Sequence, residues 1–255
     1  MRIVSSIRTA VVAALATAAT LAQADPFAGG NPQPGSLLWS GSDPSALSVS
    51  VTGYNGTGSQ FFGNFNPSSG DVGASALDDF LRFFCIDLSQ YVTGSSTPYI
   101  RETGVSDPDD SNQLARLFDR FYPNKAAMNF LNGSNFGDFG DDQAARTEAT
   151  AMQLAIWNIW YDNDYSLTAG TFQASGGDAA ARARATVMLS NIESDNTPLS
   201  GTWNFYRFTS NSNQDYLSAT YVKSEGDVTV PEPATLALLG IGLAGLGLAK
   251  RRVAA

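Results

Sequence analysis

Apolar and polar positions alternate most clearly near the two ends of the central part of the chain, and this pattern predicts strands there. Residues 46–65 show strand-like alternation interrupted by Gly and Asn turns. Residues 80–92, FLRFFCIDLSQYV, are dense in aromatic and β-branched side chains, which favours a buried strand. Two more strands are predicted at 203–208 and 217–222.

Helical spacing of apolar residues predicts three helices between these strands, over 111–121, 142–161 and 178–192. Asp141 or Asp142 can cap the second helix through its carboxylate. The predicted class is therefore α+β, with β-sandwich or half-barrel-like strands at both ends and a helical middle.

The remaining central segments are rich in Gly, Pro, Asn, Ser or Asp and are predicted to be irregular. They comprise a lead-in at 25–45 and polar loops at 66–77, 93–111 and 132–142. No internal repeat is evident, so residues 25–230 are expected to form one domain.

The N-terminus has the pattern of a secretory signal peptide. Arg2 and Arg8 provide a basic start, an apolar stretch follows, and Ala22-Gln23-Ala24 fits the small-x-small cleavage rule. Residues 1–24 are therefore predicted to be removed on export. The alternative is a first helix that anchors the protein in a membrane.

The C-terminus contains Pro231-Glu232-Pro233, an apolar run, and the basic cluster Lys250-Arg251-Arg252. The apolar run of about 16 residues would span roughly 24 Å as a helix, less than the bilayer core of about 30 Å. We expect a short transmembrane helix that inserts transiently, with the basic cluster on the cytoplasmic side. The alternative is an ordinary C-terminal membrane anchor.

This order of parts in residues 231–255 resembles the PEP-CTERM sorting signal of Gram-negative bacteria. The resemblance implies that an exosortase-type membrane protease recognises Pro231, Glu232 and Pro233. It further implies delivery of the protein to the cell envelope or an extracellular exopolysaccharide matrix. Residues 25–230 would then be the exported, extracellular domain.

Charge and composition exclude several classes of partner and chemistry. The chain has 15 basic and 24 acidic residues, of which five basic residues and one acidic residue lie in the two terminal segments. Residues 25–230 therefore contain 10 basic and 23 acidic residues, a net charge of −13. Nucleic acid and anionic lipid require basic patches, so neither is an expected partner. Because histidine is absent, Ser-His-Asp and Cys-His catalysis and histidine zinc sites are excluded.

The single cysteine, Cys85, cannot form an intrachain disulfide. It lies in the aromatic-flanked Phe83-Phe84-Cys85-Ile86-Asp87, and Gln153 lies in the later Met152-Gln153-Leu154-Ala155-Ile156-Trp157. These two motifs resemble those of the thioester domains of bacterial surface adhesins, although that pattern has Thr where this chain has Met152. The resemblance implies an internal thioester between Cys85 and Gln153.

The residue types suit that chemistry. A thiolate is a strong nucleophile, and glutamine supplies the acyl carbon with ammonia as leaving group. Phe84 and Trp157 are expected to exclude water, and Asp87 either polarises a group on the Cys85 face of the strand or holds a backbone amide. The alternative is a buried free thiol at Cys85 and a glutamine with no reactive role.

The sequence thus leads to an exported, non-enzymatic surface protein that needs no cofactor or metal and attaches to a surface amine or hydroxyl. The alternative is a passive exopolysaccharide-associated protein, and a third hypothesis is a carboxylate-based hydrolase.

The aromatic cluster of Trp157, Trp160 and Tyr161 is expected to pack in the core rather than to bind a sugar ring. The acidic loop from Asp162 lacks the Gly and Glu that an EF-hand requires.

Overall fold

A closed barrel and a small second sheet form the β structure of this protein. The computed structural model describes residues 30–42, 44–68, 81–92, 96–105, 112–123, 139–140 and 142–223. The barrel order is β1-β4-β5-β9-β8-β6, and every neighbouring pair is antiparallel. Its strands are β1 (Gly30–Ser42), β4 (Phe61–Pro67), β5 (Leu81–Cys85), β6 (Thr97–Val105), β8 (Gly201–Thr209) and β9 (Tyr216–Lys223).

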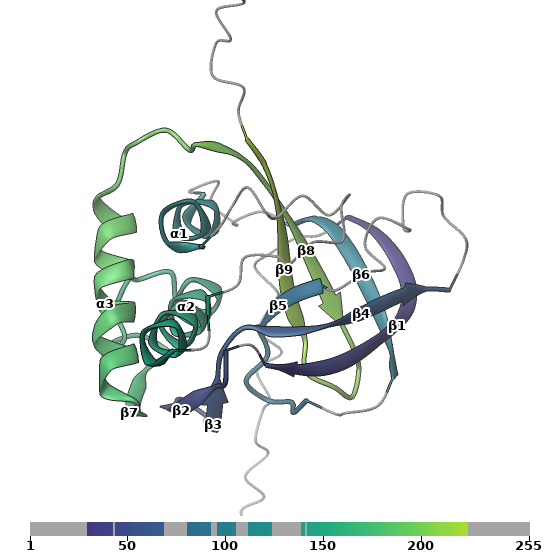
Figure 1. Ribbon diagram of the computed structural model, residues 1–255, viewed down its shortest axis with the longest axis horizontal. Coiled ribbons are helices and arrows are strands. Elements are labelled where there is room, and N and C mark those ends of the chain that lie inside the picture. The colour runs from purple at the N-terminus through teal and green to yellow at the C-terminus, as the bar shows by residue number, and fades with distance from the viewer. Residues whose placement is uncertain are drawn as a thin grey trace, which may run out of the picture.

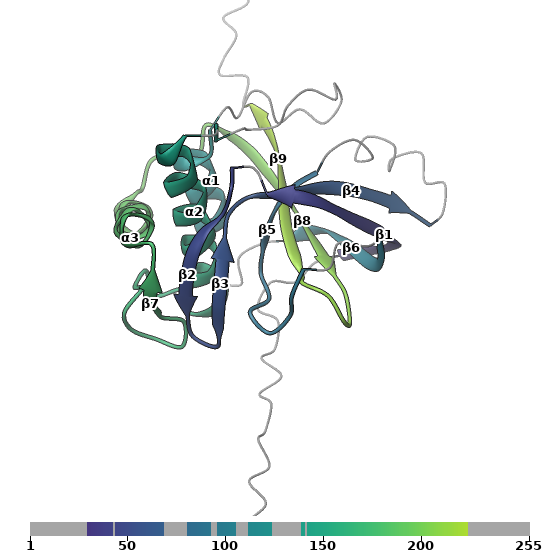
Figure 2. The same ribbon diagram turned by 60° about the horizontal axis from the view of Figure 1, so that its bottom comes forward.

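The second sheet has three strands in the order β3-β2-β7. Strands β2 (Leu47–Val51) and β3 (Tyr54–Gly58) form a hairpin, and β7 (Ala174–Gly177) pairs with β2. The helices lie on one side of the barrel (Figure 1), with the small sheet beside them (Figure 2).

Three helices pack together in the layer that covers the barrel. They are α1 (Gln113–Phe121), α2 (Gln143–Tyr161) and α3 (Ala179–Ser194). The Asp142 carboxylate accepts a hydrogen bond from the Ala145 amide at 2.8 Å, so Asp142 caps α2, while Asp141 lies outside the described residues. Consecutive residues of α2 from Ala149 to Trp160 are buried, because the barrel and the other helices surround this helix.

The structure confirms strands at both ends of the domain with the helices between them, but the larger sheet is a closed barrel rather than the predicted β-sandwich or half-barrel. The predicted irregular lead-in contains β1, and the predicted polar loop at 93–111 contains β6. These two strands pair with each other and complete the barrel. Of the residues of β1, only Gly35 and Leu37 are buried, so this strand lacks the apolar alternation that identifies a strand in sequence.

The predicted strand at 80–92 was too long, because β5 ends at Cys85. The predicted signal peptide (1–24) and the sorting segment (231–255) with its short helix lie outside the described residues and stay predictions. Within the described residues, no helix has the length and apolar character needed to cross a membrane.

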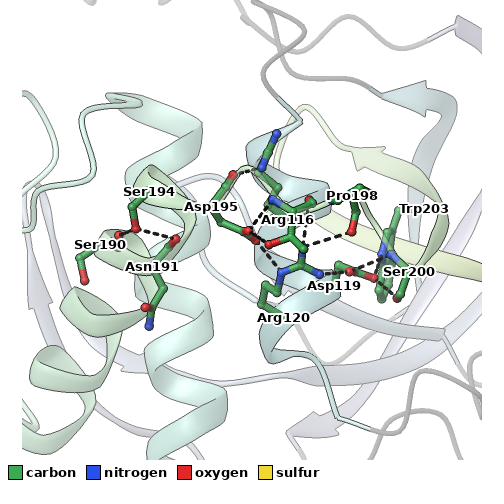
Figure 3. Close-up of polar contacts among 11 residues, drawn as sticks. Arg116, Asp119, Arg120, Ser190, Asn191, Ser194, Asp195, Pro198, Ser200 and Trp203 are labelled. Carbon is green, nitrogen blue, oxygen red and sulfur yellow. Dashed lines mark hydrogen bonds and ion pairs between the residues drawn. The ribbon is translucent and has the colours of Figure 1, made fainter.

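A buried carboxylate joins α1 to the connection between α3 and β8 (Figure 3). Asp119 is 2 % exposed and accepts hydrogen bonds from the Ser200 amide at 3.0 Å and from the Trp203 indole at 3.2 Å. It also contacts the Arg120 guanidinium, which bonds the Asp195 carboxylate at 2.5 Å. The cluster therefore links segments that are far apart in sequence but adjacent in the fold.

We expect Asp119→Ala to lower the free energy of unfolding by about 3 kcal/mol, because it leaves the Ser200 and Trp203 donors without their buried acceptor, while Arg120 keeps the Asp195 carboxylate. Urea denaturation followed by circular dichroism measures this change. Asp119→Asn, which keeps one acceptor oxygen, should cost less. Ser190→Ala, on the exposed face of α3, should change stability by less than about 0.5 kcal/mol. Equal stability of Asp119→Ala and Ser190→Ala would contradict the role of the cluster.

Candidate functional site

Cys85 and Gln153 meet in the structure, although 68 residues separate them in sequence. Cys85 is the last residue of β5 and is 6 % exposed, and Gln153 lies in the middle of α2 with no exposed surface. The Cys85 amide donates to Oε1 of Gln153 at 2.9 Å, and Nε2 of Gln153 donates to the Cys85 carbonyl at 2.7 Å. The glutamine amide therefore pairs with both backbone groups of the cysteine, as a neighbouring strand would.

The β2–β3 hairpin holds the Gln153 side chain from the other side. The Thr150 hydroxyl, one helical turn before Gln153, donates to the Gly58 carbonyl at 2.6 Å and ties β3 to α2. A Cβ atom at Gly58 would lie 3.3 Å from Cγ of Gln153, tighter than ordinary van der Waals contact. Glycine at this position therefore leaves room for the glutamine to reach the end of β5.

The backbone that follows Cys85 is fixed by hydrogen bonds from the barrel and from α2. The Ile86 amide donates to the Asp215 carbonyl at 2.9 Å, and the Tyr161 hydroxyl donates to the Ile86 carbonyl at 2.9 Å. The Gln214 side-chain amide donates to the Asp87 carbonyl at 2.5 Å. These bonds turn the chain out of the sheet directly after Cys85 and fix the cysteine backbone.

Asp87 lies beyond the end of β5, so strand alternation does not determine the direction of its side chain. Its carboxylate oxygen Oδ1 accepts hydrogen bonds from the amide and the hydroxyl of Ser89, each at 2.7 Å. Of the two predicted roles, the structure therefore shows the holding of a backbone amide, in a local Asx turn.

The two predicted aromatic residues, Phe84 and Trp157, lie in different parts of the core. Phe84 packs edge-on against Phe118 of α1, with ring centroids 6.0 Å apart, and so belongs to the core between barrel and helices. Trp157 lies one turn after Gln153, is 2 % exposed, and packs edge-on against Tyr54 of β3 at 5.9 Å. Trp157 therefore lies in the layer that surrounds Gln153, whereas Phe84 packs against α1.

The remaining members of the predicted aromatic cluster also lie in the core or at its edge. Trp160 is 7 % exposed, and the ring of half-buried Tyr161 stacks with that of Phe172 at 6.4 Å. This burial confirms the expectation that the cluster is core rather than an exposed sugar platform.

Burial controls the protonation of the site. Loss of hydration raises the pKa of the Cys85 thiol well above its usual value, and the nearby Asp87 carboxylate raises it further. Burial likewise raises the pKa of Asp215 to about 7. At neutral pH Cys85 is therefore a thiol rather than a thiolate, and its proton must be removed during any attack on a carbonyl.

A cavity of about 490 Å³ adjoins the site. Its walls come from the turn of the β2–β3 hairpin, the segment after β5, the end of α2 and the loop before β7, and include Thr52, Gly53, Asp87, Leu88, Tyr161 and Phe172. The cavity thus begins two residues after Cys85 and opens beside the residues that hold its backbone.

The loop after α2 uses its acids to order its own backbone. Asp162 accepts hydrogen bonds from the Thr171 amide at 2.7 Å and the Phe172 amide at 2.5 Å. Among the described residues, no group of three or more potential metal ligands comes together. The role of Asp162 is therefore explained by the hydrogen bonds that order this loop.

Sequence patterns missed several residues that build the site. Tyr54 and Thr150 lie in predicted elements and Gln214 in the connection between β8 and β9. Each acts through a backbone contact or a ring contact that only the fold creates. Gln153 and Trp157 are four residues apart on α2 and therefore share one face of this helix.

Chemically, the arrangement presents a carbonyl carbon to a cysteine. The Cys85 N–H polarises the Gln153 carbonyl and would stabilise negative charge that develops on Oε1 when a nucleophile adds to Cδ. The Cys85 carbonyl orients the amide nitrogen, which is the leaving group. The geometry therefore supports acyl transfer at Gln153 with Cys85 as nucleophile.

Comparisons with known proteins agree with this geometry. Residues 82–192 match the model of the thioester domain family, and residues 229–252 match that of the PEP-CTERM protein-sorting motif. No curated protein matches the chain.

Two solved structures are similar at low identity. The N-terminal thioester domain of a surface protein from Clostridium perfringens is 12 % identical, covers 57 % of this chain and 83 % of its own, and has a TM-score of 0.35. The N-terminal domain of the Streptococcus pyogenes pilus tip adhesin Cpa is 13 % identical, with coverage of 71 % and 95 % and a TM-score of 0.34.

The matched thioester segment contains both Cys85 and Gln153, and the matched sorting motif contains all six predicted residues from Pro231 to Arg252. Together the two matches support an exported surface protein. The family models thus find a thioester domain in the middle of the chain and a PEP-CTERM protein-sorting motif at its C-terminus.

Proposed function

We propose that this exported surface protein attaches covalently to a partner through an internal thioester between Cys85 and Gln153. The observation that supports the proposal most strongly is the pairing of the Gln153 amide with both backbone groups of Cys85. This pairing directs the acyl carbon toward the residue that carries the only thiol of the chain. The protein would react once with its target and so would not act as an enzyme.

The bond would form by condensation of the two side chains. Sγ of Cys85 adds to Cδ of Gln153, the Cδ–Nε2 bond breaks, and the thiol proton leaves with the nitrogen as ammonia. The Cys85 N–H stabilises the oxyanion, and burial of both residues keeps water from the product. No cofactor or external oxidant enters this step.

Attachment to a partner would break the thioester and release the Cys85 thiol. An amine or hydroxyl of the partner adds to Cδ, the Cδ–Sγ bond breaks, and the nucleophile's proton ends on Cys85. An amine leaves an amide bond to the partner, and a hydroxyl, such as one on an exopolysaccharide, leaves an ester.

The sorting motif would bring the domain to the surface of a Gram-negative cell after recognition by an exosortase-type protease and transient membrane insertion.

A second candidate function is passive association with an extracellular matrix. The same two hydrogen bonds satisfy the polar atoms of a buried glutamine, so Gln153 has a purely structural explanation as well. In that case Cys85 stays a free buried thiol, and retention in the matrix would not depend on it.

The intact mass of the purified protein separates these candidates. We expect wild type to weigh one ammonia less than its sequence predicts, and Cys85→Ala and Gln153→Ala to have full mass because neither can condense. Cys85→Ala keeps the backbone that pairs with Gln153, which makes it the better matched control. Full mass in freshly prepared wild type, with one titratable thiol after denaturation, would rule out the thioester.

Exposure to methylamine tests whether the bond is an activated acyl group. We expect the wild-type mass to rise by one methylamine, located at Gln153 by peptide mapping, with one thiol released at Cys85. Thr150→Val, which removes the link between α2 and Gly58, should slow bond formation because Gln153 is less firmly held. An adduct at any other residue, or one that forms equally in Cys85→Ala, would contradict an acyl donor at Gln153.

A further inference from the structure

We infer that Tyr54 of β3 shields the Cys85–Gln153 pair from water and that Gly56 exists as glycine to let its ring lie there. This inference rests on the proposed thioester function and assigns a residue outside the two sequence motifs to it. Tyr54 belongs to a hairpin that is neither in the barrel nor in α2. It therefore adds a third, separate element to the site.

Aromatic rings contact the Tyr54 ring on two sides. On the inner side it meets Trp157 edge-on at 5.9 Å, and Trp157 is 2 % exposed. On the outer side it meets Tyr91 at 6.0 Å, and Tyr91 is 69 % exposed. Half-buried Tyr54 thus lies between solvent and the aromatic residue one turn beyond Gln153.

The ring folds back along its own strand, over Gly56. A Cβ atom at Gly56 would lie 2.3 Å from the Tyr54 hydroxyl oxygen, so any other residue would displace the end of the ring. The hydroxyl donates to the Thr57 carbonyl at a long 3.3 Å, which makes this hydrogen bond a weak restraint. The open space above Gly56, rather than the hydroxyl bond, therefore determines where the ring lies.

Tyr54 is close enough to the reactive residues to act on them. The Tyr54 ring packs on Trp157, which lies one helical turn after Gln153. Burial, and to a lesser extent the charge of an ionised Cys85, raises the pKa of the Tyr54 hydroxyl. The last residue of the same strand, Gly58, contacts Cγ of Gln153. One short strand thus contacts Gln153 at one end and, through the Tyr54 ring at the other end, the tryptophan one turn after Gln153.

The hairpin turn gives this shield a route for opening. Thr52 and Gly53, directly before Tyr54, line the cavity of about 490 Å³ beside the site. A group that enters the cavity would press on the turn that carries Tyr54, and a ring held by weak contacts can swing aside. The shield therefore favours a nucleophile delivered by a docked partner over water from bulk solvent.

The rate at which water opens the thioester in the full-length protein tests this inference. Tyr54→Ala should raise the hydrolysis rate about tenfold or more by admitting water, whereas Tyr54→Phe, which keeps the ring, should change it less than about twofold. Gly56→Ala should also accelerate hydrolysis, because it displaces the ring. The double variant Tyr54→Ala/Gly56→Ala should be no faster than Tyr54→Ala alone, since there is no ring left to displace.

Tyr221→Ala is the matched control for general destabilisation. Tyr221 is another half-buried strand tyrosine, packed on Trp203 near the Asp119 cluster, and its removal should leave hydrolysis unchanged. Acceleration by Tyr221→Ala equal to that by Tyr54→Ala would overturn the shield, as would equal acceleration by Tyr54→Phe and Tyr54→Ala.

Failure of the thioester itself gives a different result. A wild-type chain of full mass has a free Cys85 thiol, and the rate of its labelling by iodoacetamide then replaces hydrolysis as the measurement. The same order of variants is expected, because the ring limits access to the sulfur in either state. Identical labelling of wild type and Tyr54→Ala would refute the shield, while full mass alone refutes only the bond.

Discussion

The pairing of the Gln153 amide with the backbone of Cys85 is the interaction on which the site depends. Two hydrogen bonds, one in each direction, bind α2 to the end of β5 and place an acyl carbon beside a buried cysteine. A buried amide without partners would cost roughly 1–3 kcal/mol, so the pairing also stabilises the contact between helix and barrel. The same two hydrogen bonds thus stabilise the fold and position the candidate reactive groups, and both residues belong to the buried core.

The rest of the fold holds these two residues in place. The barrel fixes β5 between β4 and β9, and the β8–β9 connection holds the backbone after Cys85 through Asp215 and Gln214. The helical layer is tied to the barrel by the Asp119 cluster at one end, and the small sheet is tied to α2 through Thr150. Strong burial follows from this enclosure and explains why the thiol pKa is raised.

Much of the site could be predicted from sequence, because its two central residues lie in recognisable segments. The aromatic and β-branched run at 80–92 and the helical spacing over 142–161 identified the strand and the helix that carry them, although the strand ends earlier, at Cys85. The Asp142 cap likewise follows from local chemistry, since an aspartate directly before a helix accepts from its first turn.

The missed parts depend on contacts between distant segments. Strands β1 and β6 bury few apolar side chains and are strands because each has a partner in the barrel. Tyr54 has no local signal, as its ring position depends on space above Gly56 and on a tryptophan from α2. Strand alternation could not predict the direction of the Asp87 side chain, because the sequence does not show that β5 ends at Cys85. Directly after Cys85, the Ile86 amide bonds the Asp215 carbonyl.

A high-resolution crystal structure of the freshly purified protein tests the central claim most directly, by the separation of Sγ of Cys85 from Cδ of Gln153. The proposed function predicts continuous density at covalent bonding distance between these two atoms, with Nε2 absent and Oε1 still accepting from the Cys85 amide. An intact glutamine amide that keeps both hydrogen bonds to the Cys85 backbone, with sulfur at van der Waals distance, would contradict it.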